Sequence, residues 1–170
     1  GLLYVEPAMR HLRSTWRLGD AERLAELAAR TLAADPERTG ELVDMLLTRA
    51  EFLGHQDRRA EQRDVIDEAL LRSRGKGDAM REALALYESA RLRFVEEELH
   101  TAVIEAREAL VAAQKANADR VVTNCQALLG AIAFREARYQ EARNHVNEML
   151  AMARRRSDPG AEAEALYTLG

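Results

Sequence analysis

Four histidines are the residues best suited to bind a metal in this chain, and their spacing is nearly regular. His11, His55, His100 and His145 follow one another at intervals of 44, 45 and 45 residues. A zinc site needs three or four converging ligands, typically an HExxH pair or Cys and His pairs at short spacing. The sequence contains no such pair, and its one cysteine, Cys125, has no second cysteine to join it. We therefore expect no metal site.

Two short clusters have the composition of ion-binding sites. Gly75-Lys76-Gly77 resembles part of a phosphate-binding loop, but that motif also needs an earlier glycine and a Ser or Thr directly after the lysine. Neither is present, so we interpret the stretch as a turn in which Asp78 is the N-cap of the next helix. Glu96-Glu97-Glu98 could bind a cation together with His100. We favour the alternative that these carboxylates stand at the start of a helix, where the helix dipole stabilises negative charge.

The remaining reactive groups also have structural interpretations. Cys125 lies in an apolar stretch beside small residues, so we expect a buried and inert thiol. Arg154-Arg155-Arg156 closes a long predicted helix, where cations are favoured; contact with a phosphate or an acidic partner is the alternative. No nucleophile, base and orienting group fall together along the chain. We therefore expect a protein that is not an enzyme and needs no cofactor.

The composition predicts an all-α fold. Aromatic residues make up only 5% of the 170 residues, hydrophobic residues reach 47% because Ala and Leu are abundant, and there are three prolines. Ala, Leu, Arg and Glu are strong helix formers. The 29 acidic and 25 basic residues are mixed along the chain, so no basic patch is available for nucleic acid. No apolar run approaches the roughly 20 residues of a membrane helix, and the lone cysteine suits the reducing cytoplasm.

The helices that place these residues are expected to form repeats, because residues of one kind recur every 40 positions. Ala50, Ala90 and Gly130 form one such column, and Gly170 continues it. Four further columns are Ala69, Ala109 and Met149; Leu70, Leu110 and Leu150; Phe52, Leu92 and Ile132; and Gln62, Ala102 and Ala142. Small residues that recur at one position predict that two helices approach closely there. Gln62 is the exception in its column.

Each unit contains two amphipathic stretches separated by turn-forming residues. In the third unit the stretches cover 79–96 and 99–115, with apolar residues three or four positions apart. Gly, Pro, Asp and Asn gather between such stretches, for example at Gly19-Asp20 and Asp35-Pro36. We predict units over 5–36, 43–77, 83–118 and 123–159, and a partial unit over 160–170.

This pattern resembles the tetratricopeptide repeat family, whose units read Trp-x2-Leu-Gly-x2-Tyr, then Ala-x3-Phe, then Pro. The matches in the fourth unit are the pair Leu129-Gly130, Tyr139 at the start of the second helix, Ala142 as its small residue, and Val146 at the aromatic position. The tryptophan column instead holds Leu46, Leu86 and Gln126, and the usual period is 34 residues. The resemblance implies one domain of antiparallel hairpins, stacked in a right-handed superhelix of about four repeats, the last one incomplete.

The end of the sequence predicts a longer parent protein. Residues 157–160 followed by 161–170 are similar to links in the long-period arrays of bacterial signalling ATPases and transcription regulators. Ala163 to Gly170 reads as the first helix of another unit, and a repeat cannot bury its apolar face alone. We expect the chain to be part of a larger multidomain protein. Leu166 and Leu169 could also pair with the same helix of a second copy, which would give a homodimer.

The resemblance also implies a concave groove lined by the first helix of each unit. The residues expected to point into it are Arg13, Arg17, Glu51, His55, Tyr87, Arg91, Asn124 and Arg135. Tyr and Arg are common anchors of interfaces because they bury a large area and also offer hydrogen-bond donors. The expected partner is a protein or peptide segment with acidic and apolar side chains, which other domains of the parent could supply.

The sequence therefore predicts a protein-interaction module of a bacterial signalling or transcription-regulatory protein. A preformed concave surface would lose little ordering entropy when it binds a partner segment. The alternative is a sensor domain that closes around a small effector or peptide and changes the pitch of the superhelix. That role needs an enclosed pocket, and the scarcity of aromatic residues counts mildly against one.

Overall fold

The computed structural model describes the whole chain except residues 1–4, 15–16, 158, 161, 164 and 166–170. All regular structure in the described part is helical. The helices are α1 (Val5–Ser14), α2 (Leu18–Ala33), α3 (Thr39–His55), α4 (Arg59–Lys76), α5 (Ala79–Val95), α6 (Leu99–Lys115), α7 (Asp119–Arg135) and α8 (Tyr139–Arg155), with a 3-10 turn η2 (Pro36–Arg38) before α3. No helix of the described residues is both long and apolar enough to cross a membrane.

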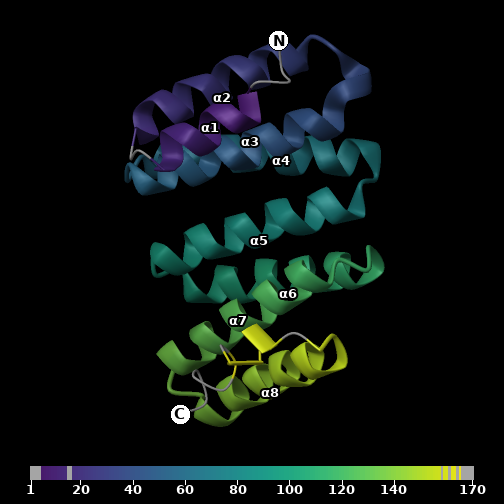
Figure 1. The fold of residues 1–170 in the computed structure, drawn as a ribbon. Helices are drawn as coiled ribbons and strands as arrows, with labels where there is room; N and C mark the ends of the chain where they lie inside the picture. Colours follow the sequence, from purple (N-terminus) through teal and green to yellow (C-terminus); the bar gives the residue numbers. More distant parts are fainter. Residues whose placement is uncertain (1–4, 15–16, 158, 161, 164, 166–170) are drawn as a thin grey trace.

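The helices pack in sequence order, each against the one before it, so that hairpins stack along one axis (Figure 1). The four hairpins are α1–α2, α3–α4, α5–α6 and α7–α8. The prediction of an all-α solenoid of helical hairpins is confirmed. After α8, residues 159–160, 162–163 and 165 are again helical. The rest of the predicted partial unit, including Leu166 and Leu169, lies outside the described residues.

The turns follow a shorter period than the one expected from the sequence. Residues with φ between 51° and 66° end six consecutive helices, at 20-residue intervals: Asp57, Gly77, Glu97, Asn117, Ala137 and Ser157. In the first five turns the next N–H donates to the carbonyl five residues earlier, over 2.8 to 3.0 Å, as when Arg58 donates to Leu53. This bond satisfies an orphan carbonyl at each helix end. Turns within hairpins and between hairpins therefore have the same backbone geometry.

The regular turns also set where the helices begin. The helices α3, α5 and α7 start at residues 39, 79 and 119, each four residues before the predicted unit boundary at 43, 83 and 123. Asp78 is the N-cap of α5, as expected, because its side chain accepts from the N–H of Arg81 over 3.1 Å. The seventeen-residue helix and the three-residue link together make a unit of 20, and a hairpin takes two of them.

Most residues of the predicted columns are buried, except Leu70 and Leu110, which are partly buried. Ala50 and Ala90 are fully buried, and Gly130 is buried too. The columns that start at Phe52 and at Ala69 are buried in all three units as well. Ala102, Ala106 and Ala109 of α6 are fully buried, so α5 and α6 can approach closely. The side chains that the repeat places at one position therefore occupy one interior layer.

The exception at Gln62 is explained by its neighbour across the hairpin. Gln62 is only 2% exposed and faces Gly54 of α3; a methyl group added to Gly54 would lie 2.8 Å from Gln62 Nε2. Forty residues later the same two positions hold Phe94 and Ala102. Large and small side chains have exchanged places across the seam, so its volume is filled in both hairpins.

Arginine–carboxylate pairs connect neighbouring elements of the stack. Glu22 of α2 is almost fully buried and accepts from Arg49 of α3 over 2.7 Å and from Arg58 over 3.3 Å. Arg81 of α5 forms a bidentate pair with Asp44 of α3, at 2.7 and 2.9 Å. Planar two-bond pairs of this kind fix orientation as well as distance. They hold the register between successive hairpins.

Candidate functional site

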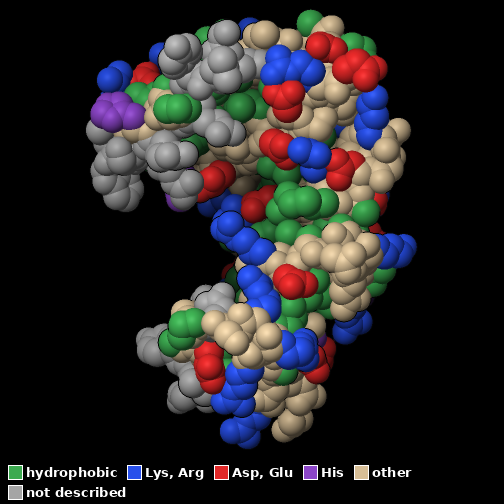
Figure 2. Space-filling view, turned by 45° about the vertical axis from the view of Figure 1, so that its right-hand side comes forward, with side chains coloured by type: hydrophobic (Ala, Val, Ile, Leu, Met, Phe, Trp, Pro, Cys, Tyr) green, Lys and Arg blue, Asp and Glu red, His purple; other side chains and the backbone are tan. Residues whose placement is uncertain are grey.

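The first helices of the hairpins form the inner layer of the solenoid. The helix α3 contacts α5, the first helix of the next hairpin, and α5 contacts α7 in the same way. Among the described residues, no two of the second helices α2, α4, α6 and α8 make as many contacts with each other. The side on which α3, α5 and α7 approach each other is therefore the concave one. Figure 2 shows the molecule hollowed on one side, with Lys or Arg side chains at the hollow.

Three of the predicted groove residues meet in one small polar pocket on this layer. Its volume is about 160 Å³, and we call it the inner polar pocket. Its lining residues are Glu51, Gly54, His55, Arg59, Gln62, Arg91, Leu92 and Val95. The lining thus comes from α3, α4 and α5, which bring together residues 40 positions apart. The remaining lining residues, Gly54, Arg59, Gln62, Leu92 and Val95, were not predicted as site residues. The exception at Gln62 in its column was the available signal.

The polar side chains of the inner polar pocket are organised by contacts within the chain. His55 Nε2 lies 3.8 Å from Glu51 Oε1. Arg59 donates from Nη1 to Gln62 Oε1 over 3.1 Å and from Nε to Asp57 Oδ1 over 2.9 Å. These contacts leave a small, hydrogen-bonding recess in place of the aromatic side chain that occupies the same position in the next hairpin.

Arg91 and Tyr87 lie one turn apart on α5. Arg91 donates to Glu88 Oε2 over 2.6 Å. Burial lowers the pKa of Arg91, but the charge of Glu88 and its hydrogen bond, with smaller contributions from Tyr87 and Glu51, raise the pKa overall. Burial raises the pKa of Tyr87, and the charge of Glu88 adds to that shift. At neutral pH the site therefore presents a guanidinium cation beside a neutral phenol.

Arg135 is the last of the predicted groove residues and the last residue of α7. It pairs with Glu97 of the α5–α6 turn, and its guanidinium carbon lies 5.5 Å from the centroid of the Phe94 ring. Such a stack combines cation–π attraction with coverage of the ring. Asn124 lies partly buried in the first half of α7 and lines neither the inner polar pocket nor the apolar recess between α7 and α8.

The two predicted groove residues of the first unit are placed differently. Arg17 is not on an inner helix face; it is the N-cap residue of α2, and its exposed side chain pairs with Asp20 at 2.6 Å. Position 17 corresponds to Asp57 in the 40-residue register, which is a turn residue, so the sequence register already places it off the helix. Arg13 belongs to α1, and its side chain lies outside the described part of the chain.

The clusters singled out in the sequence have structural partners. Glu96, Glu97 and Glu98 form the α5–α6 turn; Glu96 and Glu98 pair with Arg63, and Glu98 also accepts from Arg93 over 2.8 Å. Arg154 donates to Glu162 over 2.9 Å. Glu96 and Glu98 thus connect α4, α5 and α6. Their placement is consistent with the interpretation that the three glutamates have a structural role at the start of a helix.

The reactive side chains do not converge on a metal-binding arrangement in the described part. The histidines lie on α1, α3, α6 and α8, and no group of three or more His, Cys, Asp or Glu residues there could hold a metal ion. Cys125 is fully buried, and burial raises the pKa of its thiol to about 12. The prediction of a buried thiol is confirmed, and the thiolate is negligible at neutral pH.

Comparison with known proteins supports the fold without naming a function. No protein-family model matches the chain, and no curated protein sequence does so either. Among solved structures the chain is similar to the crystal structure of BtubC (BKLC) from P. vanneervenii, with a TM-score of 0.74 and 20% sequence identity. The match covers 87% of this chain and 61% of that one. At this identity the similarity concerns the fold.

Proposed function

We propose that this chain is a non-catalytic protein-interaction module that binds a partner segment on the concave face formed by α3, α5 and α7. The inner polar pocket supports this proposal most directly, because it brings Glu51, His55 and Arg91 together on that face. A recess of this size accepts one side chain rather than a whole ligand, which suits recognition of a segment laid along the face. The partner expected there has acidic and apolar side chains.

The arginines of the concave face can exchange their present partners at little cost. Arg91 pairs with Glu88, and Arg135 pairs with Glu97, so both guanidinium groups already form ion pairs in the free protein. Both arginine side chains are more than two fifths exposed. Ion pairs at such positions contribute roughly 0 to 1 kcal/mol. A partner carboxylate that also buries apolar surface can therefore displace the internal one.

The resemblance to long-period tetratricopeptide arrays supports a wider setting for the module. We propose that it belongs to a bacterial signalling or transcription-regulatory protein of the cytoplasm and that its partner is another protein or another domain of its parent. An effector-sensing role remains the second candidate. The inner polar pocket, at about 160 Å³, is smaller than the roughly 300 to 1,000 Å³ of typical small-molecule sites, whereas the apolar recess between α7 and α8, at about 640 Å³, falls within that range. We favour the interaction role because three predicted groove residues meet in the smaller, polar pocket.

Charge reversal on the concave face tests the proposal. The probes are three fluorescent peptides of equal length that alternate leucine with glutamate, glutamine or lysine. We expect the glutamate peptide to bind the chain most tightly, and the double variant Arg91→Glu, Arg135→Glu to lose at least about tenfold in affinity, because two favourable charge contacts become repulsive. Fluorescence anisotropy measures binding, and circular dichroism confirms unchanged helix content.

The matched control is Arg72→Glu, which reverses a charge on the second helix α4. Its affinity for the glutamate peptide should equal that of the unmodified chain. Equal affinity of all three peptides, or unchanged binding by the double variant, would contradict the assignment of the partner site to the concave face.

A further inference from the structure

The inner polar pocket is lined by one buried amide. Gln62 of α4 is only 2% exposed, and its Oε1 accepts from Arg59 Nη1 over 3.1 Å. A guanidinium group only donates, so this contact fixes which end of the amide is the oxygen. Gln62 Nε2 then faces Gly54 and has no hydrogen-bond partner among the described residues. Because a buried donor without an acceptor is unfavourable, this N–H group is placed to donate to a ligand.

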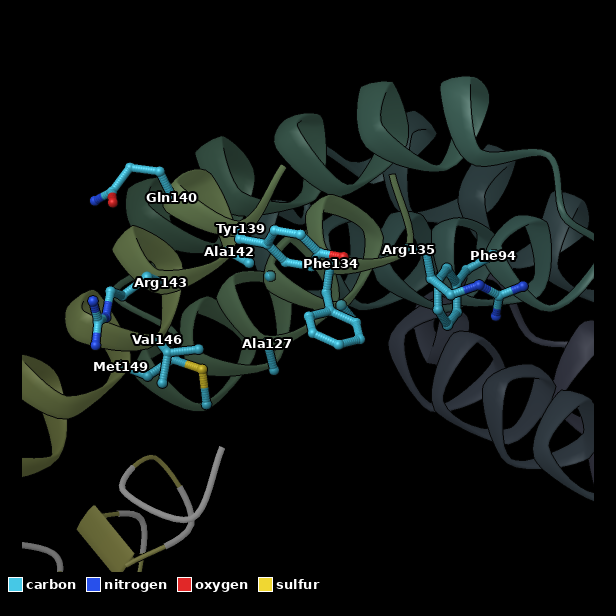
Figure 3. Close-up of a pocket in the computed structure, with 12 residues that line it drawn as sticks. Phe94, Ala127, Phe134, Arg135, Tyr139, Gln140, Ala142, Arg143, Val146 and Met149 are labelled. Carbon is cyan, nitrogen blue, oxygen red and sulfur yellow. The ribbon is translucent and has the colours of Figure 1, made fainter. Parts of the chain in front are cut away.

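The third and fourth hairpins fill this place with an aromatic ring. Shifts of 40 and 80 residues take Gly54 to Phe94 and to Phe134. Figure 3 shows the fourth hairpin, where Phe134 lies beside Tyr139, the equivalent of Arg59; their ring centroids are 5.6 Å apart. In the second hairpin the glycine leaves this space open, and the side chains around it are polar. The polar pocket is therefore a feature of the second hairpin that the third and fourth do not share.

The charged groups around the pocket already balance one another. Arg59 pairs with Asp57 at 2.9 Å, and Arg91 pairs with Glu88 at 2.6 Å. Glu51 adds a third carboxylate, in the lining itself. A carboxylate that enters the pocket would meet the charge of Glu51, and a cation would meet the two guanidinium groups. A neutral polar group avoids both repulsions and also the cost of burying a charge.

The pocket offers an acceptor as well as a donor. A carboxylate has about four lone-pair sites, so Glu51 can accept from a ligand in addition to its contacts within the chain. One of these contacts is with His55, whose Nε2 lies 3.8 Å from Glu51 Oε1. A carboxamide carries a carbonyl oxygen and an NH₂ group, which match the free N–H of Gln62 and the carboxylate of Glu51. The pocket volume of about 160 Å³ suits the end of one side chain.

We propose that the inner polar pocket binds a carboxamide, the side chain of an asparagine or glutamine in the partner segment, with Gln62 donating to its oxygen and Glu51 accepting from its nitrogen. This inference rests on the proposed function and names the residue type that the segment places in the pocket. The acidic side chains of the segment stay outside, beside the exposed guanidinium groups of Arg91 and Arg135. One such subsite fixes the register of the segment on the concave face.

Propionamide and propionate, which are nearly equal in size and differ in charge, test the pocket directly. We expect propionamide to shift the NMR signal of the Gln62 side-chain amide with a dissociation constant on the order of 10 to 100 mM, because so small a ligand binds weakly. Propionate should bind about fivefold more weakly, since Glu51 repels it. Glu51→Gln should remove most of this preference.

Two glycine variants show whether the response comes from this pocket. Gly54→Ala blocks it, because the added methyl group would lie 2.8 Å from Gln62 Nε2, and it should abolish the shift. Gly75→Ala makes the same change on α4, where the added group meets nothing within 4 Å, and should leave the shift unchanged. Circular dichroism confirms that both variants keep their helix content.

The leucine–glutamate peptide of the proposed function connects the pocket to a partner segment. Exchanging its glutamates for glutamine one at a time should give one peptide that binds about threefold tighter or more, and Gly54→Ala should remove that gain. An equal response of Gln62 to both small ligands, or to neither, would overturn the carboxamide site even if the glutamate peptide binds. So would a peptide series without any gain. If propionamide binds as expected and no peptide does, the proposed function alone is wrong.

Discussion

The second and fourth hairpins build the same scaffold from different side chains. Across the seam, Gly54 and Gln62 in the second hairpin correspond to Phe134 and Ala142 in the fourth. The buried Leu46 and Val65 of the second hairpin correspond to the partly buried Gln126 and His145 of the fourth, where His145 Nδ1 lies 2.6 Å from Gln126 Oε1. The difference teaches that the residues at facing positions change together in this repeat, although the exchanged Phe134 is 63% exposed in the fourth hairpin.

Breaking the exchange at the second seam should have the largest effect on stability. Gly54→Phe would force a ring into the space of Gln62, whose side chain is buried and whose Nε2 lies 2.8 Å from an added Cβ. Overpacking of this kind costs about 2 to 3 kcal/mol. The free energy of unfolding, measured by urea denaturation, should fall by that amount.

The rescue of this variant sharpens the comparison. Gly54→Phe combined with Gln62→Ala gives the second hairpin the pair found in the third and fourth hairpins. We expect the double variant to unfold within about 1 kcal/mol of the unmodified chain. If the effects of Gly54→Phe and Gln62→Ala on the free energy of unfolding were additive, the exchange across the seam would not be the reason for the exception at Gln62.

The column pattern made the fold predictable, because burial must recur wherever helices touch. Small residues such as Ala50, Ala90 and Gly130 indicate that two helices approach closely, whichever residues face them. All three are buried. In the sequence, the exchange at Gly54 and Gln62 was visible only as the exception of Gln62 in its column. The sequence alone does not say that these positions face each other, which requires the hairpin geometry.

The 20-residue turn period was harder to predict for a physical reason. A left-handed backbone conformation usually favours glycine. Of the six left-handed turn residues here, Gly77 is the one glycine, and the other five are Asp, Glu, Asn, Ala and Ser. The sequence therefore lacks a common signal. Arg17 was predicted as a groove residue, but it is the N-cap residue of α2, whereas Arg91 lies within α5.

The turns inside the two hairpins offer a smaller test. Asp57 and Ala137 occupy equivalent positions with φ of 59° and 57°. Left-handed backbone costs an L-residue about 1 to 2 kcal/mol, and Asp tolerates it better than Ala does. We expect Ala137→Gly to raise the free energy of unfolding by about 0.5 to 1 kcal/mol, measured by urea denaturation, after the added entropy of the unfolded chain is subtracted.

The matched control for that turn is Asp57→Gly. Its effect should be near zero, because Asp57 also accepts a hydrogen bond from Arg59 that glycine cannot replace. An equal gain from both substitutions would show that the two turns do not differ in strain.

The interior pair gives the smallest effect, and it depends on pH. Burial lowers the pKa of His145 below its ordinary value of 6.5, and Arg107 and Arg138 add to the shift while Glu141 opposes it. The unfolded chain therefore binds more protons than the folded chain between the lowered pKa and about 6.5. The stability contributed by neutral His145 is present above pH 6.5 and is lost as the pH falls through the folded pKa.

Restoring the apolar pair of the second hairpin should remove this dependence. In Gln126→Leu, His145→Val, the difference in unfolding free energy between pH 7 and pH 5 should be smaller than in the unmodified chain, because the partly buried imidazole is no longer there to be protonated. Single His145→Val is the less suitable change, since it leaves the partly buried Gln126 without its hydrogen-bond partner. An unchanged pH profile would show that groups other than His145 set the stability of the fourth hairpin in this range.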